Sequence, residues 1–217
     1  HQGGGRATRP PAMSQMARSD CPSWRSPRAW FVLILVVAAG IGVDLGTKAW
    51  AFSSIGESQV LLDRSALIDN EHWSPIPPGA TAVAIPGRIL DFRLVLNNGA
   101  IFGIGARHRM FFIIFTTTAI IIAFWIFAKG TRSRQYAAQI ALGLILAGGL
   151  GNLYDRIAIG RVRDFMHMFP RRYLPFDMTW PGGGNEWFPW VFNAGDVMLM
   201  IGMVVLMVYF WRQPVDA

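Results

Sequence analysis

The stretch YAAQIALGLILAGGLGNLY, residues 136–154, contains no charged residue, and the charge-rich segment DRIAIGRVRDF, residues 155–165, follows it directly. About 20 apolar residues are needed to cross the hydrocarbon core of a bilayer as a helix. Residues 136–154 therefore predict a transmembrane helix that ends where the charges begin. The small-residue run AGGLG, residues 147–151, would let a neighbouring helix pack closely against it.

The composition of the whole chain argues against an ordinary soluble domain. Of its 217 residues, 53% are hydrophobic and 15% are charged, and the mean hydropathy is +0.34. Three further apolar stretches of suitable length predict spans at residues 29–52, 110–128 and 192–210. The sequence thus predicts four spans, which place both termini on the same side of a membrane.

Lysine and arginine near the spans predict which side is cytoplasmic, because short cytoplasmic loops are enriched in them. Such residues precede the first span, occupy the short loop between the second and third spans, and follow the last span, at Arg25, Arg28, Lys129, Arg132, Arg134 and Arg212. We therefore expect both termini in the cytoplasm and the long loops 53–109 and 155–191 outside it. The net charge of +7 is interpreted as basic flanks that face anionic lipids, and not as a nucleic-acid-binding surface.

The expected organisation has three parts. Residues 1–28, rich in Gly, Pro, Ser and Arg, are expected to form a disordered basic cytoplasmic tail. Residues 29–212 hold the four spans and both outer loops, and residues 213–217 form a cytoplasmic C-terminal tail. In the first loop, ILDFRLVLNNGAIFGIG, residues 89–105, predicts two strands around an Asn-Asn-Gly turn. In the second, MTWPGGGNEWFPW, residues 178–190, is expected to place aromatic side chains at the level of the lipid headgroups.

Ionisable side chains inside a spanning segment are costly, so each one needs an account. Asp44 and Lys48, four residues apart on one helix face, can form an ion pair that is either structural or close to a binding site. Asn152 and Asp155 share a face at the end of the third span. Asp155 directly precedes Arg156, which suits a structural ion pair.

Three aspartates, Asp155, Asp164 and Asp196, are predicted to lie near the outer surface. Two carboxylates at close range share a proton, so that one acts as a base on water and the other as an acid, which is the chemistry of an aspartic protease. The spacing does not choose the pair, but the apolar residues after Asp164 mildly favour Asp164 with Asp196. His167 is interpreted as a surface or interface residue, and no cluster of His, Cys and acidic residues has metal-ligand spacing.

Five motifs, in one order along the chain, resemble those of bacterial lipoprotein signal peptidase, also called signal peptidase II. They are DLGTK (44–48), NNGAIFG (97–103), GGLGNLYDR (148–156), VRDF (162–165) and FNAGD (192–196). The resemblance extends from about residue 29 to residue 211. It implies a membrane all-α bundle of four transmembrane helices with a small extracytoplasmic β-rich segment, located in the bacterial cytoplasmic (inner) membrane.

The family removes the signal peptide from bacterial prolipoproteins and cuts before a cysteine that carries a diacylglyceryl group. The resemblance implies that the catalytic dyad is Asp164 and Asp196. It implies that the polar positions lining the site and binding substrate are Asn97, Asn152, Arg156 and Asn193, and that the structural positions near the site are Asp44, Lys48 and Asp155. The implied reaction uses water held between two aspartates and needs neither a metal nor a cofactor.

The expected partners are lipid-modified prolipoproteins and membrane lipids, with no nucleic acid, and the chain is expected to be a monomer. The stretch between the two dyad aspartates is longer than the family pattern, with WPGGGNEW, residues 180–187, as the insertion, and we interpret this aromatic loop as a lid. A proton-coupled transporter or a non-catalytic membrane scaffold are the alternative functions. A transporter is disfavoured because the acids gather at one edge of the membrane and not across it.

Overall fold

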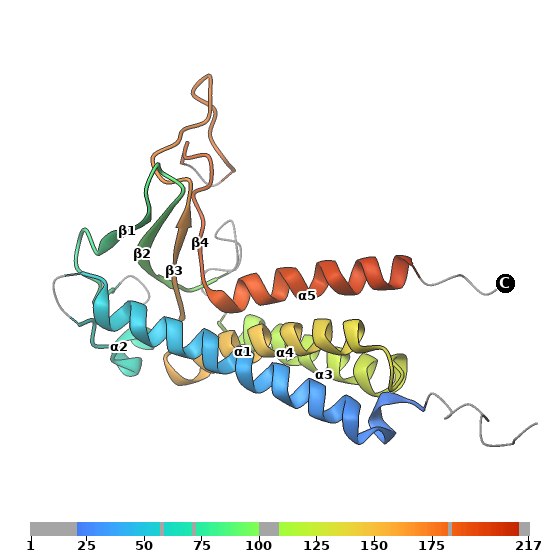
Figure 1. Ribbon diagram of the computed structural model, residues 1–217. Helices are drawn as coiled ribbons and strands as arrows, with labels where there is room; N and C mark the ends of the chain where they lie inside the picture. The colour runs from blue at the N-terminus through green and yellow to red at the C-terminus, as the bar shows by residue number, and fades with distance from the viewer. Residues whose placement is uncertain (1–20, 57–58, 71–72, 100–108, 182–183, 213–217) are drawn as a thin grey trace, which may run out of the picture.

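Four long apolar helices form the body of the computed structural model, which describes residues 21–56, 59–70, 73–99, 109–181 and 184–212. They are α1 (Pro27–Ser54), α3 (Arg109–Trp125), α4 (Tyr136–Ala158) and α5 (Ala194–Trp211). A short π-helical turn, η4 (Ile126–Gly130), extends α3. Figure 1 shows the four helices running alongside one another with a small sheet at one end. Each helix is long and apolar enough to cross a membrane, so the four predicted spans are confirmed.

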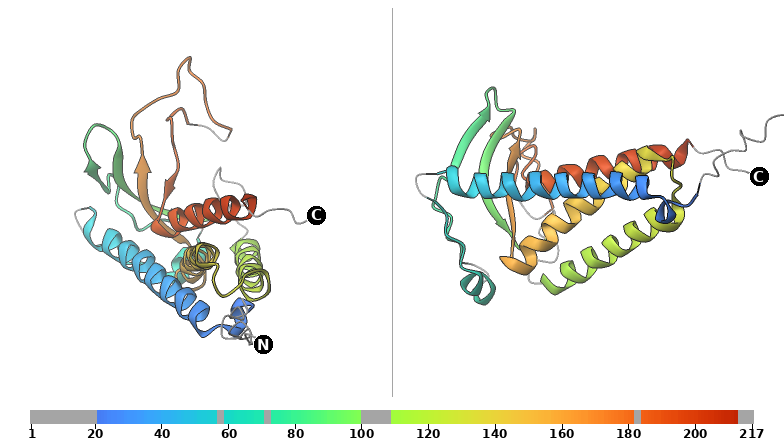
Figure 2. Two further views of the ribbon diagram at one scale, coloured as in Figure 1. Left: turned by 45° about the vertical axis from the view of Figure 1, so that its right-hand side comes forward. Right: turned by 60° about the horizontal axis from the view of Figure 1, so that its bottom comes forward.

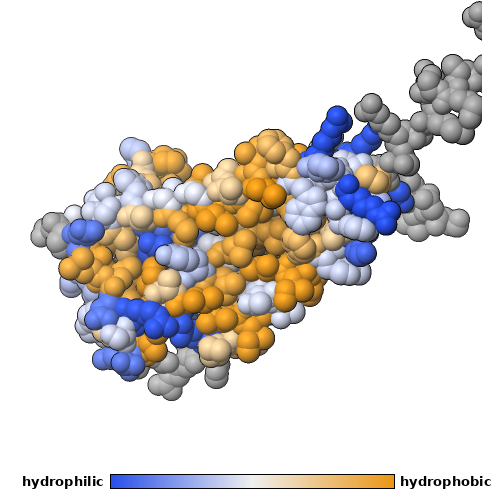
Figure 3. Space-filling view, turned by 90° about the horizontal axis from the view of Figure 1, so that it is seen from below, coloured by the Kyte–Doolittle hydropathy of each residue, from blue (hydrophilic) through white to orange (hydrophobic). Residues whose placement is uncertain are grey.

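The surface of the helices is suited to lipid. The face seen in Figure 3 has a broad apolar belt, and charged residues gather at both of its ends. Phe31 on α1 and Phe111 on α3 are more than half exposed, as are many other large apolar side chains of the bundle. Water would solvate such a surface poorly, whereas the hydrocarbon core of a bilayer covers it without penalty.

Helix α4 lies at the centre of the bundle. Within its most apolar 18-residue window 61% of the residues are buried, compared with 22%, 17% and 11% in the windows of α1, α3 and α5. Small residues make this possible, because Gly143 faces Val36 of α1, Gly148 faces the backbone of Gly195 in α5, and Gly149 faces α3. Without side chains at these positions, three helices approach the α4 backbone closely.

The sheet has four antiparallel strands in the order β1 (Thr81–Ile85), β2 (Leu90–Asn97), β3 (Val162–Met168) and β4 (Val191–Phe192). It rests on the outer end of α1, where Ala51 and Phe52 join Leu94 and Phe165 in a buried apolar cluster. Strand β3 follows α4 closely, and β4 is separated from α5 by Asn193 alone. The sheet therefore places two of its strands directly at the ends of two helices.

The outer loops differ in part from the expected layout. The first strand of the segment 89–105 is confirmed as β2, but its expected partner strand falls on residues 100–108, which lie outside the described residues. Strand β2 pairs instead with β1 on one edge and with β3 on the other. A short helix, α2 (Arg64–Asp69), precedes β1 and begins at Asp63, whose side chain accepts from the backbone amides of the first turn.

Part of the range 1–28, which was expected to be disordered, is ordered. Residues Ser23–Arg25 form the 3-10 turn η2, and α1 already begins at Pro27 with Ser26 as its cap. The turn is ordered because the buried hydroxyl of Ser23 lies 2.8 Å from that of Thr131, at the turn between α3 and α4. The predictions for residues 1–20 and 213–217 lie outside the described residues.

The close packing of α4 on α5 predicts a strong effect of a single methyl group. A Cβ at Gly148 would collide with the carbonyl oxygen of Gly195, so Gly148→Ala is expected to separate the two helices and cost about 1–3 kcal/mol of stability. The measurement is the thermal unfolding temperature of the purified protein in detergent. Gly42→Ala on α1 is the matched control, because an added Cβ there has nothing within 4 Å. Equal unfolding temperatures for the two variants would contradict the packing described here.

Candidate active site

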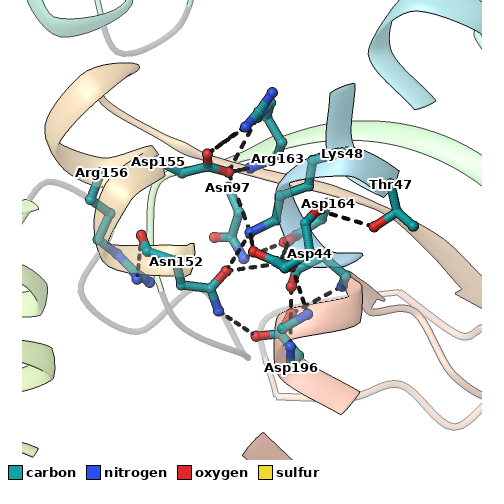
Figure 4. Close-up of polar contacts among 12 residues, drawn as sticks. Asp44, Thr47, Lys48, Asn97, Asn152, Asp155, Arg156, Arg163, Asp164 and Asp196 are labelled. Atoms are coloured by element: carbon teal, nitrogen blue, oxygen red, sulfur yellow. Dashed lines mark hydrogen bonds and ion pairs between the residues drawn. The ribbon is translucent and has the colours of Figure 1, made fainter. Parts of the chain in front are cut away.

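The expected site residues converge where the C-terminal halves of α1 and α4 and the start of α5 meet strands β2 and β3 (Figure 4). Asp44 and Lys48 come from α1, Asn152, Asp155 and Arg156 from α4, Asn97 from β2, Asp164 from β3, Asn193 from the residue before α5, and Asp196 from α5. The structure therefore gathers all nine residues that the sequence singled out, from positions as far apart in the chain as 44 and 196.

Asp196 is held by the first turn of α5. Asn193 is the N-cap, and its side-chain oxygen accepts from the backbone N–H of Asp196 at 3.1 Å, while Asp196 Oδ2 accepts from the backbone N–H of Asn193 at 3.0 Å. This reciprocal capping box satisfies two backbone donors that a helix start would otherwise leave unpaired. Asp196 Oδ1 accepts a further hydrogen bond from Asn152 Nδ2 at 2.8 Å. The carboxylate is thus fixed in place and sits in the favourable field of a helix N-terminus.

Asp164 is almost completely buried on β3, opposite Val95 of β2. Its two carboxyl oxygens accept from Asn97 Nδ2 at 2.9 Å and from Asn193 Nδ2 at 2.6 Å. Burial, followed by the negative charge of Asp196, raises the pKa of Asp164 to about 7. A carboxyl group with such a pKa holds a proton for much of the time near neutral pH.

The side chain of Asn193 joins the two aspartates. Its amide nitrogen donates to Asp164 Oδ1 and, at 3.1 Å, to Asn152 Oδ1, and its oxygen caps Asp196. Asn152 in turn contacts Asp196 through its own amide nitrogen. Two amides therefore link one aspartate with a raised pKa to a second that is anchored at a helix start.

A buried ion cluster lies next to the two aspartates. Lys48 Nζ donates to Asp44 Oδ2 at 2.6 Å and to Asn152 Oδ1 at 2.8 Å, and it lies 3.5 Å from Asp155 Oδ2. Asp44 Oδ1 accepts from the backbone N–H of Gly195 at 2.7 Å, within the first turn of α5. The predicted Asp44–Lys48 ion pair is confirmed, and it connects α1 both to α4 and to α5.

Asp155 forms a structural ion pair at the end of α4, but its partner is not the adjacent Arg156. Asp155 accepts instead from Arg163, through Nη2 at 2.8 Å and through the backbone N–H at 3.0 Å. Neighbours along a helix point in different directions, and Arg156 turns towards Asn152 O at 3.4 Å and the ring of Phe112 at 5.3 Å. Asp155 therefore ties the end of α4 to the start of β3.

His167, which was interpreted as a surface or interface residue, is buried within the chain. Its Nε2 lies 3.0 Å from the carbonyl oxygen of Phe188 and 3.4 Å from the Glu186 carboxylate, so it fastens the β3–β4 loop to β3. The sequence did not single out Arg161. Its guanidinium donates to three backbone carbonyls, those of Leu67, Asn70 and Trp73. No grouping of three potential metal ligands among His, Cys, Asp and Glu occurs within the described part of the chain.

Comparisons with known proteins identify the family to which the chain belongs. A family model described as signal peptidase (SPase) II matches residues 36–212. The lipoprotein signal peptidase of Aquifex aeolicus is 30% identical over 180 residues, which are 78% of this chain and 92% of that protein. The lipoprotein signal peptidase of Streptococcus pyogenes serotype M1 is 29% identical over 183 residues, covering 84% and 93% of the two chains.

A solved bacterial membrane enzyme has the same fold. Its structure aligns with a TM-score of 0.60 at 24% sequence identity, over 85% of this chain and 93% of that one. The match extends to the four apolar helices with a small antiparallel sheet, so the expected fold class is confirmed. Since the family model covers most of the sequence, the chain belongs to the signal peptidase II family, a family of membrane-embedded aspartic peptidases.

Proposed function

We propose that this protein removes the signal peptide from prolipoproteins by hydrolysing the peptide bond before a diacylglyceryl-modified cysteine, with Asp164 and Asp196 as the catalytic dyad. Membership of the signal peptidase II family supports the substrate class. The observation that carries the dyad is the Asn193 side chain, which links the raised-pKa carboxyl of Asp164 to the capped carboxylate of Asp196. The two carboxyl groups have different environments, and such a difference allows one of them to act as an acid and the other as a base.

In the proposed reaction Asp196 is the base and Asp164 is the acid. Asp196 takes a proton from a water molecule between the two carboxyl groups while the water oxygen attacks the carbonyl carbon of the scissile bond. Asp164 donates its proton to the carbonyl oxygen as the tetrahedral intermediate forms. The intermediate then collapses: the hydroxyl formed from the carbonyl oxygen returns its proton to Asp164 as the C=O bond re-forms, the C–N bond breaks, and the departing amine takes up the proton that Asp196 received. The dyad returns to one shared proton, and no covalent enzyme intermediate is formed.

The four polar residues assigned to substrate binding have different tasks in this proposal. The side chains of Asn97, Asn152 and Asn193 already hold the two carboxyl groups, so they orient the dyad. Among the described residues, the Arg156 guanidinium donates to Asn152 O at 3.4 Å, and it interacts electrostatically with both Asp164 and Asp196. Its guanidinium is therefore the group we assign to a substrate carbonyl oxygen or to the developing oxyanion.

The proposed orientation places both chain ends in the cytoplasm and the site at the extracytoplasmic face. It is supported by Arg25, Lys129 and Arg212, which lie at the end of the bundle opposite the sheet. Residues 29–212 would act as one monomeric membrane unit, in contact with bilayer lipids, and the segments before and after it as cytoplasmic tails. The lipid chains of the substrate would stay in the bilayer while the scissile bond reaches the outer ends of α4 and α5.

Replacing either dyad residue should abolish processing without unfolding the protein. Asp164→Asn and Asp196→Asn are each expected to lower kcat/KM for a lipid-modified prolipoprotein peptide by about 10²–10⁴. The control is Asp155→Asn, which weakens the pair with Arg163 and should lower the unfolding temperature while the folded fraction stays active. Full activity of either dyad variant would exclude that residue from catalysis, and full activity of both would favour a transporter or scaffold.

The protonation of Asp164 predicts an alkaline fall in activity. Because the pKa of Asp164 is raised to about 7, the group loses its proton as the pH increases through that value and can then no longer act as the acid. At pH values well above it, kcat/KM should fall by about tenfold per pH unit. The measurement is a pH profile of cleavage in detergent, with circular dichroism to confirm that the protein stays folded. A rate that stays level up to about pH 9 would rule out Asp164 as the acid.

Removing the buried cation should destabilise the bundle. Lys48→Met leaves the fully buried Asp44 and Asp155 with one partner fewer, and an unpaired buried charge costs about 3–5 kcal/mol. We expect a lower unfolding temperature and loss of activity. Lys129→Met, at an exposed position on η4, is the matched control and should change little. If the two variants unfolded at the same temperature, Lys48 would not have the structural role assigned to it.

A further inference from the structure

The loop between β3 and β4 lies at the level where the bilayer must end. Figure 1 shows the strands following one another in the order β1 to β4 along the direction of the helix axes, and β4, which leads into α5 through Asn193, is the strand at the α5 end of this order. Because the four spans fix the bilayer normal along their axes, the outer membrane surface crosses the molecule near the first turn of α5. The β3–β4 connection begins and ends at this height.

This loop leaves the bundle sideways. Figures 1 and 2 show it extending on the side of α5, across the helix axes and not along them. We call residues 169–181 and 184–190 its two arms. Since the loop extends across the bilayer normal, it lies over the lipid beside α5 and not above the other helices.

The two arms are braced against each other. Leu174 N donates to Asn185 O at 2.7 Å, and Trp187 N donates to Arg172 O at 2.6 Å. Trp180 Nε1 donates to Glu186 O at 2.9 Å. At the base, His167 on β3 contacts the carbonyl of Phe188 and the carboxylate of Glu186. Side chains on these arms are therefore held in fixed positions relative to the catalytic strand.

The outer part of the arms exposes apolar side chains. Phe176 is 93% exposed, and Tyr173, Met178 and Trp187 are each more than half exposed. Phe176 and Asp177 both have positive φ, 59° and 53°, which is an unfavourable conformation for residues other than glycine. A strained backbone thus presents an almost fully exposed Phe176 ring on the described part of the loop.

The charges near the apolar group suit the headgroup region. Arg171 and Arg172 lie at the start of the first arm, where Arg171 contacts Asp91 at 3.2 Å and Arg172 donates to the carbonyl oxygen of Gly87 at 3.3 Å. Cationic groups at this level are compatible with anionic lipid headgroups. Asp177, beside Phe176, disfavours insertion into hydrocarbon. Aromatic rings flanked by polar groups are typical of the membrane–water interface.

We propose that the outer arms bind the headgroup region of the outer leaflet, with Phe176, Tyr173, Met178 and Trp187 as the contact residues. The partner is the bilayer that holds the four spans, and the contact sets the height of β3 and β4 relative to the lipid. This lipid contact does not depend on the proposed peptidase reaction, because none of the four contact residues belongs to the proposed catalytic site.

The test compares two environment-sensitive probes in lipid nanodiscs. A fluorophore is attached at Phe176→Cys in a Cys21→Ser background, and, as a matched control, at Val83→Cys. Val83 is also largely exposed, but it lies on β1, at the edge of the sheet opposite to β4. The nanodiscs contain phosphatidylethanolamine and phosphatidylglycerol, with or without a lipid that carries a doxyl quencher near its headgroup. Iodide serves as the quencher in water, and the unfolding temperature confirms that each labelled protein is folded.

We expect the lipid quencher to act several-fold more strongly at position 176 than at 83, and iodide to act more strongly at 83. Equal access of iodide to both positions, with no extra quenching by the lipid, would overturn the proposal and place the loop in water. A probe at 176 shielded from both quenchers would also overturn it, because the loop would then pack against protein, such as a second copy of the chain.

Discussion

The ammonium group of Lys48, fully buried at the outer edge of the membrane domain, is the charge on which the arrangement of the site depends. A single cation in such a place is unfavourable unless anions and hydrogen-bond acceptors surround it. Its partners come from α1 and α4, and the carboxylate of Asp44 extends the contact to the backbone of α5. Neutralising one lysine thus requires three helices to meet at one height, which is the height of the two aspartates.

The balance of positive and negative charges around Asp164 explains why this residue holds a proton. Asp44, Asp155, Asp164 and Asp196 bring four carboxylates together, and Lys48, Arg156 and Arg163 bring three cations. If every group were ionised, one negative charge would remain uncompensated in a poorly solvated place. A single proton on Asp164 removes it, in agreement with the raised pKa of that residue. The proton that Asp164 would donate in the proposed reaction is therefore also the one that offsets this excess of negative charge among the described residues of the cluster.

Local patterns in the sequence account for much of this structure. Apolar runs of about 20 residues predicted the spans because lipid imposes that length, and the four-residue spacing of Asp44 and Lys48 predicted their ion pair because helix geometry imposes it. The choice of Asp164 and Asp196 came mainly from motif resemblance, since spacing along the chain does not report distance in space. The contact between Asp44 and Gly195 joins positions 151 residues apart. Similarly, Arg163 and Asp155 meet only because the chain reverses between α4 and β3.

Gly151 on α4 shows how tightly distant positions constrain each other. The space that its side chain would fill is occupied by the carboxylate of Asp44. Because residue 151 on α4 has no side chain, the carboxylate of Asp44 on α1 has room to lie against the α4 backbone. In evolutionary terms the two positions behave as one site. An alanine at 151 would expel the carboxylate that holds both Lys48 and the start of α5, so a lineage can abandon this glycine only after it has abandoned that acid. Divergence of the lipid-facing surface, by contrast, is limited by little more than hydrophobicity.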